Sequence, residues 1–142
     1  MVEIRQHREE FTFQLIIPET LTEEDTRRYL DTFAAALAAG EPFGMIFSYS
    51  GGRPRKERAA ELLERAWLHE HRPEVARHCF GIAMIANPSL SAILTKIVLR
   101  GIGARMFGCP CAQFGSLDEA RAWLRARRGA HITAGATAAG ER

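Results

Sequence analysis

The sequence predicts an α/β fold with a mixed sheet of about five strands, an N-terminal hairpin and about four helices. Short apolar runs with β-branched and aromatic residues alternate along the chain with longer segments whose apolar residues recur at helical spacing. This alternation is typical of βαβ units, and therefore of a largely parallel sheet. The first two strand-like runs have no helix between them, so we expect them to pair as a hairpin and to make the sheet mixed.

The N-terminal part of the chain predicts two strands and one helix. Residues 11–17 (FTFQLII) alternate and then become continuously apolar, which favours a strand, and a shorter strand is expected at residues 2–6. Thr22 and Asp25 then have the spacing of a helix cap, and Gly40 suits the end of the same helix. The apolar residues of this helix recur at helical spacing: Leu30, Phe33, Ala34 and Leu37.

The middle of the chain predicts two further strands on either side of a second helix. Residues 43–47 are a short apolar run, and residues 79–86 (CFGIAMIA) are an unbroken one, as in strands that are covered on both faces. Between them, residues 55–70 read as an amphipathic helix, and Pro73 is expected to start a new turn. The apolar stripe expected on this helix is Ala59, Leu62, Leu63, Ala66 and Trp67.

A third helix is expected from residue 89 to about residue 100. Asn87 can cap it, and Pro88 can occupy its first turn, where a missing amide hydrogen costs nothing. The run ARMFGCPCAQF then predicts a last strand near residues 106–113.

The chain is expected to form one domain over residues 1–128, followed by an Ala/Gly-rich tail over residues 129–142. Its last helix should span residues 116–128, because Ser116 and Glu119 have the spacing of a capping box. The expected core consists of Phe13, Leu15, Leu30, Phe33, Leu37, Ile46, Leu63, Trp67, Ile82, Met84, Leu94, Phe114, Trp123 and Leu124.

Composition argues against several functional classes. With 19 Lys and Arg against 17 Asp and Glu, the net charge is only +2, so no dominant basic face for nucleic acid is expected. We expect no membrane span and no signal peptide, because no uncharged apolar stretch is long enough and residues 1–11 are polar and acidic. Three cysteines do not make a disulfide framework, which indicates a reducing, cytoplasmic compartment.

The segment FSYSGGRPRKE, residues 47–57, is a candidate anion or phosphorylation site. It brings hydroxyls, glycines and cations together near an expected helix start, where a phosphate would gain from the helix dipole and from charged donors. A plain turn with solvated cations remains the alternative. The candidate residues are Ser48, Tyr49, Ser50, Gly51, Gly52, Arg53, Arg55 and Lys56.

Other reactive residues do not assemble into a recognisable catalytic or metal motif. Cys109 and Cys111 flank a proline in a C-x-C pattern, which lacks the C-x-x-C spacing of thiol oxidoreductases, so a structural role is expected. His69, His71 and His78 lack the i, i+4 spacing of helical metal ligands and suit a solvated helix end. Because the sequence also lacks G-x-S-x-G and P-loop patterns, we expect no enzyme, no metal and no cofactor.

The third helix is a candidate interface. Its apolar arc, together with the following GIGARMF, is wider than one sheet face requires, and basic residues lie along its edge. A homodimer or another protein partner would fit this surface, an acidic membrane surface would fit it less well, and cover by the rest of the fold is the remaining alternative. The candidate residues are Leu90, Ile93, Ile97, Leu99, Arg100 and Ile102.

Three phrases of the sequence resemble the SpoIIAA-like proteins, which share the STAS and CRAL-TRIO type of α/β fold. They are FTFQLIIPETLTEEDTRRYLDTF, the helix RKERAAELLERAWLHEH with RHCFGIAMIANPS after it, and the closing AQFGSLDEARAWLRA. The resemblance implies a non-enzymatic regulatory or protein-interaction module. Its CRAL-TRIO side implies the alternative of a small-molecule or lipid-binding module with an apolar cavity beside the sheet. In STAS anti-sigma antagonists, a phosphorylated serine follows an aspartate in the equivalent turn, where this chain has Ser48 and Tyr49, with Ser50 as the nearest hydroxyl.

Overall fold

A computed structural model describes the backbone of residues 1–49, 54–99 and 101–140, and their side chains except at 88, 89, 91, 97–99 and 136–140. Its central sheet has the strand order β1-β2-β4-β6-β7, with β1 antiparallel to β2 and the other neighbours parallel. These strands are β1 (Glu3–His7), β2 (Thr12–Ile17), β4 (Phe43–Tyr49), β6 (Cys79–Ile85) and β7 (Cys111–Phe114). A small second sheet pairs β3 (Thr20–Leu21) with β5 (Arg55–Lys56) in parallel.

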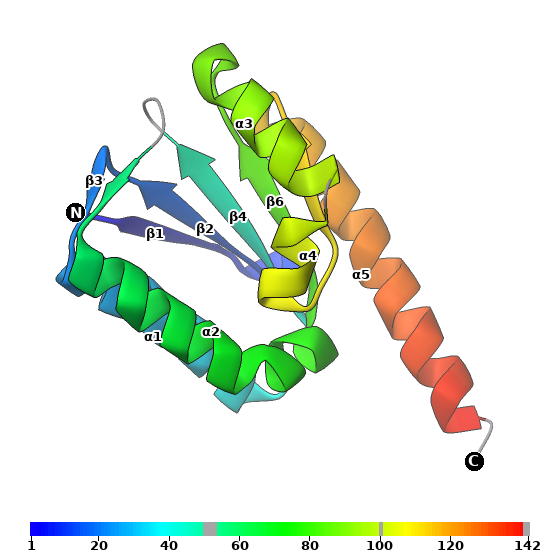
Figure 1. The fold of residues 1–142 in the computed structure, drawn as a ribbon. Helices are drawn as coiled ribbons and strands as arrows, with labels where there is room; N and C mark the ends of the chain where they lie inside the picture. Colours follow the sequence, from blue (N-terminus) through cyan, green and yellow to red (C-terminus); the bar gives the residue numbers. More distant parts are fainter. Residues whose placement is uncertain (50–53, 100, 141–142) are drawn as a thin grey trace.

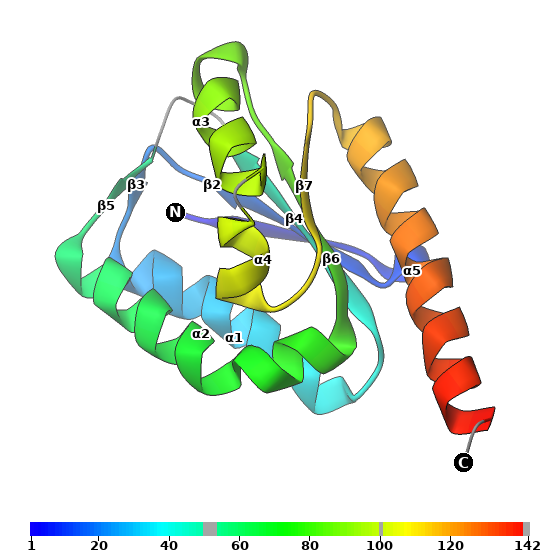
Figure 2. The same cartoon turned by 45° about the vertical axis from the view of Figure 1, so that its right-hand side comes forward.

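The sheet is covered by helices on both faces (Figures 1 and 2). One face carries α1 (Glu23–Ala39), α2 (Arg58–His78), α3 (Pro88–Leu99) and α4 (Ile102–Phe107). The other face carries α5 (Leu117–Gly140), which packs on β6, β4 and β7. The expected α/β class, the mixed five-stranded sheet and the N-terminal hairpin are therefore confirmed.

The larger core lies under the four helices and is rich in aromatic rings. Phe33 of α1 is fully buried and contacts Phe43, Phe47, Trp67 and Phe107, with centroid distances of 5.8 to 6.5 Å. These partners come from β4, α2 and α4, so one ring joins four elements of the fold.

The second core lies under α5, where two glycines let the helix approach the sheet closely. Gly44 and Gly81 are paired neighbours on β4 and β6. A Cβ at Gly81 would lie 3.0 Å from Trp123 and 3.2 Å from Leu124, both on α5. A side chain at this point would therefore require Trp123 and Leu124 to shift.

Three helix starts follow the expected caps. The Thr22 hydroxyl accepts from the Asp25 amide at 3.1 Å, and the Asp25 carboxylate accepts from the Val2 amide at 2.8 Å. The Asn87 side chain accepts from the amide of Leu90 at 3.1 Å. At α5 the Ser116 hydroxyl accepts from the Glu119 amide at 3.2 Å. Local sequence therefore sets where α1, α3 and α5 begin.

Two expected element boundaries were wrong. Residues 55 and 56 form β5, and α2 begins at Arg58, because pairing with β3 takes these residues into the small sheet. The last strand begins at Cys111, because residues 102–107 form the short helix α4, which buries Phe107.

The interior of α2 also differs from the expectation. Pro73 lies inside the helix and starts no new turn. The buried residues are Ala60, Glu64, Leu68 and Val75, so the stripe is rotated from the predicted one, and Leu62 is exposed.

Residues 129–140, which were expected to form a tail, continue α5 as a helix, and they are rich in alanine, a strong helix former. Within the described part of the chain, no helix is long and apolar enough to cross a membrane. Eight of the fourteen expected core residues are buried. The other six are only partly buried and pack against the cores from their edges: Phe13, Leu37, Leu63, Trp67, Phe114 and Trp123.

Candidate functional site

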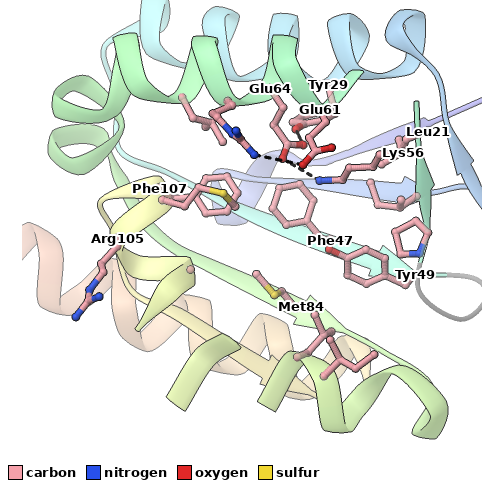
Figure 3. Close-up of a pocket in the computed structure, with 18 of the residues that line it drawn as sticks. Leu21, Tyr29, Phe47, Tyr49, Lys56, Glu61, Glu64, Met84, Arg105 and Phe107 are labelled. Carbon is pink, nitrogen blue, oxygen red and sulfur yellow. Dashed lines mark hydrogen bonds and ion pairs between the residues drawn. The ribbon is translucent and has the colours of Figure 1, made fainter. Parts of the chain in front are cut away.

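An open cleft lies between α2 on one side and α3 with α4 on the other, above the sheet face that carries the larger core (Figure 3). We call it the α2–α3 cleft. Its volume is about 660 Å³, which falls in the range of small-molecule sites. Its apolar lining is formed by buried side chains of the core, namely Ile17, Leu21, Phe47, Leu68, Met84, Leu90, Leu94 and Phe107.

The packing of the helices explains why this space stays open. α1 packs against α2, while α3 packs against α4 and β7. α4 also packs against α2, and both ribbon views place it between α3 and α2. The cleft is therefore bounded by α4 at one end and by the β3–β5 pair, which supplies Leu21 and Lys56, at the other.

A buried carboxylate forms the polar centre of the β5 end. Glu64 of α2 is 9% exposed, and its Oε1 lies 2.8 Å from Lys56 Nζ. Its Oε2 accepts a hydrogen bond from the hydroxyl of Tyr29 on α1. Because a buried carboxylate without partners would be costly, these two donors make its position on the inner face of α2 possible.

Two tyrosines at the same end keep their protons. Burial first, and then the negative charge of Glu64, raise the pKa of both the Tyr29 and Tyr49 hydroxyls above the ordinary value. Both therefore remain neutral hydrogen-bond donors across the physiological pH range. Figure 3 shows Tyr49 and Lys56 together at the end of the cleft opposite Arg105 and Phe107.

The α2 wall and the α4 end carry further charges. Arg65 lies 3.3 Å from Glu61 one turn earlier on α2. Arg72 Nε donates to the backbone carbonyl of Arg105 at 2.6 Å, which ties α2 to α4. Among the residues that the structure describes, neither Arg72 nor Arg105 has an acidic partner.

The predicted hydroxyl and cation segment is divided between different places. Alternate residues of a strand point to opposite faces, so Tyr49 lines the cleft while Ser48 lies on the other face, where its hydroxyl accepts from Gln14 Nε2 at 3.0 Å. Arg55 and Lys56 belong to β5 and not to a helix start. Ser50, Gly51, Gly52 and Arg53 lie outside the described residues, so an anion or phosphorylation site there stays a prediction.

The predicted interface residues are divided as well. Leu90 is 2% exposed and lines the cleft, so it does not belong to an outer surface. Ile93 and Ile102 are 39% and 42% exposed. Arg100 and the side chains of Ile97 and Leu99 lie outside the described part of the structure.

The cysteines and histidines form no metal site among the described residues, since no group of three or more His, Cys, Asp or Glu side chains there could hold an ion. Cys109 is buried, and Cys111 is partly buried on β7 with its thiol 3.5 Å from the Cys109 carbonyl. His71 stacks on Trp67 with a centroid distance of 4.1 Å. His69 lines the cleft.

Sequence reasoning missed Glu64 and Tyr29, the two residues that organise the polar end. Glu64 lies four residues from both Ala60 and Leu68, which are buried. An acid at the centre of this i, i+4 series was the available signal, but the expected stripe was placed on a neighbouring face of the helix. Tyr29 lies one turn before Phe33 on the buried face of α1, and the sequence pattern indicated only that this residue is helical.

The fold is that of SpoIIAA-like proteins. The structure resembles an uncharacterized protein of the DUF3478 family with a SpoIIAA-like fold from Shewanella loihica PV-4. The TM-score is 0.62 and the sequence identity 17%, over 87% of this chain and 92% of that one. No family model and no curated protein matches the sequence. The resemblance deduced from the sequence is thus confirmed at the level of the fold.

Proposed function

We propose that this protein is a non-enzymatic binding module that holds a small molecule with a large apolar part in the α2–α3 cleft. The observation that carries the proposal is the cleft itself, with about 660 Å³ of space over an apolar floor. A domain that worked by its outer surface alone would have no need of an opening into its core, because interiors are otherwise closely packed.

The lining supports a mixed mode of recognition. Phe47, Met84 and Leu94 offer apolar contact at the floor and the α3 wall, where a ligand would displace water. Tyr49 and Lys56 offer hydrogen-bond donors at one end, which would orient the ligand. In this proposal the cleft binds and does not catalyse. Three free cysteines support the reducing cytoplasm as its place of action.

A neutral fluorescent probe tests the proposal. N-phenyl-1-naphthylamine brightens when it leaves water, so its titration into the protein should give a saturable signal. Ile93→Trp places a larger side chain at the edge of the cleft and should weaken binding by about tenfold or more. A tenfold loss corresponds to about 1.4 kcal/mol. Ile102→Trp is the matched control, since Ile102 is equally exposed but does not line the cleft.

The outcomes separate clearly. Saturable binding that Ile93→Trp weakens and Ile102→Trp leaves unchanged would support the proposal. No binding, or equal binding by both variants, would overturn it. Native mass spectrometry of the purified protein adds an independent arm, because a co-purifying small molecule should appear as added mass that Ile93→Trp removes.

A second candidate function is a regulatory module that binds a protein partner or a second copy of itself. It is favoured by three exposed apolar side chains on α3 and α4: Ile93, Ile102 and Met106, each about 40% exposed. On this hypothesis the wild type is a homodimer in light scattering, and Ile102→Glu gives a folded monomer. A wild type that stays monomeric at high micromolar concentration would remove the homodimer, and vesicle flotation would test the membrane alternative.

A further inference from the structure

The charges that line the α2–α3 cleft do not balance. Among the described residues, four cationic side chains line it, namely Lys56, Arg65, Arg72 and Arg105, against two carboxylates, Glu61 and Glu64. Lys56 is paired with Glu64, and Arg65 with Glu61. The remaining excess of positive charge lies on Arg72 and Arg105, at the α4 end of the cleft.

The two ends of the cleft therefore differ in what they attract. At the β5 end, the Glu64 carboxylate would repel an anion and already uses Lys56, so this end suits a neutral polar group. At the α4 end, Arg72 Nε donates a hydrogen bond to the backbone carbonyl of Arg105. This bond holds the guanidinium group of Arg72 beside the backbone of Arg105. The terminal nitrogens of both guanidinium groups have no acidic partner among the described residues, and they are well suited to a carboxylate, phosphate or sulfonate.

The same charges argue against a cationic ligand. The rings of Tyr29, Phe47 and Tyr49 at the cleft could in principle face an ammonium group. A second cation would, however, add to the positive excess of the described lining, and both of its carboxylates are already paired, Glu64 with Lys56 and Glu61 with Arg65. An anion reduces the positive excess, so the residues that line the cleft favour a negatively charged ligand.

We propose that the ligand of the α2–α3 cleft is an amphipathic organic anion, with its apolar body on the Phe47–Met84–Leu94 floor and its negative group at Arg72 and Arg105. This inference rests on the proposed function, since it names the class of ligand for the same cleft. Figure 3 shows Tyr49 and Lys56 at one end and Arg105 at the other, with the Arg105 side chain directed away from the floor. The negative group would therefore lie at the outer edge of the α4 end, and the neutral end of the ligand toward Tyr49.

A matched pair of probes tests the sign of the charge. 1-Anilinonaphthalene-8-sulfonate has the same ring system as N-phenyl-1-naphthylamine and adds one sulfonate. In low salt the anionic probe should bind about tenfold more tightly than the neutral one, and high salt should reduce the difference because the arginines are exposed.

Substitutions then locate the anion. Arg105→Gln keeps the backbone carbonyl that Arg72 contacts, and Arg72→Gln removes the other guanidinium. Each should weaken the anionic probe several-fold and leave the neutral probe unchanged. Arg77→Gln is the control. Arg77 is an exposed arginine that lies on α2, as Arg72 does, but does not line the cleft, and its substitution alters the net charge equally.

Competition identifies the source of the negative group. Laurate and dodecyl phosphate should displace the neutral probe better than dodecanol, and the stronger of the two anions indicates a fatty acid or a phosphate ester. Equal displacement by dodecanol, or equal loss in Arg77→Gln and Arg105→Gln, would overturn the inference while leaving neutral-probe binding, and thus the proposed function, intact. Absence of neutral-probe binding would instead overturn the proposed function.

Discussion

Replacing Phe107 by alanine should destabilise the protein strongly, because its buried ring packs the short helix α4 against the core. Phe107 is 4% exposed. Its ring stacks on Phe33 at a centroid distance of 6.2 Å with an interplanar angle of 11°, and it lies 5.8 Å from the ring of Phe47. α4 has only six residues, so packing and not helix propensity must hold it in place.

The magnitude follows from the loss of a fully packed ring. Truncation of a buried phenylalanine costs about 3–5 kcal/mol. Edge and stacked ring contacts add about 0.5–1.5 kcal/mol beyond area alone, which puts Phe107 near the middle or the upper part of that range. At about 2–4 °C per kcal/mol for a chain of this size, the melting temperature should fall by about 10 °C.

Urea unfolding followed by circular dichroism and tryptophan fluorescence measures this cost. Met106→Ala is the matched control, because Met106 is the adjacent residue of α4 and is 41% exposed. It should change the unfolding free energy by only about 0.5 kcal/mol. A loss below about 1.5 kcal/mol in Phe107→Ala, or an equal loss in both variants, would refute the packing of α4 described above.

Three further predictions follow from other parts of the fold. Gly81→Val should cost about 1–3 kcal/mol or more in urea unfolding, because its side chain would collide with Trp123 at the α5 interface. The hydrogen bond and charge of Arg121 lower the pKa of Glu10 below its ordinary value of 4.5. The stability that this pair contributes is therefore present above pH 4.5 and is lost as the pH falls below it. In Glu10→Gln the unfolding free energy should consequently decrease less steeply at acid pH than in the wild type. Hydrogen bonding to the neighbouring Cys109 and burial raise the pKa of the Cys111 thiol, so a disulfide reagent at pH 8 should label it slowly and label Cys79 only after unfolding.

Each of these predictions has its own contrary result. Gly115→Ala is the control for Gly81→Val, since a Cβ there would meet its nearest atom only at 4.0 Å, and equal losses would contradict the close approach of α5. An unchanged acid limb in Glu10→Gln would show that the ion pair contributes nothing. Rapid labelling of Cys111 in the native state would contradict the raised pKa.

The sequence by itself determined the fold class, the succession of the five main-sheet strands along the chain and the starts of α1, α3 and α5, because these depend on residues close together in the chain. Thr22 with Asp25, and Asn87 with the amide of Leu90, form contacts three residues apart. The unbroken apolar run that became β6 needs only its own composition to indicate a strand covered on both faces. The N-terminal hairpin was predicted correctly because no helix separates its two strand-like runs, which is also a local feature of the sequence.

Only the tertiary structure decided where the cleft lies and which residues line it. Whether residues 55–56 open a helix or pair with β3, and whether residues 102–107 form a strand or pack as α4, depends on distant partners. Glu64 became a buried group because Tyr29 and Lys56, 35 and 8 residues away, meet its carboxylate. Local patterns carry the period of an element but not its rotation against its neighbours, and that rotation places each side chain in the core, in the cleft or in water.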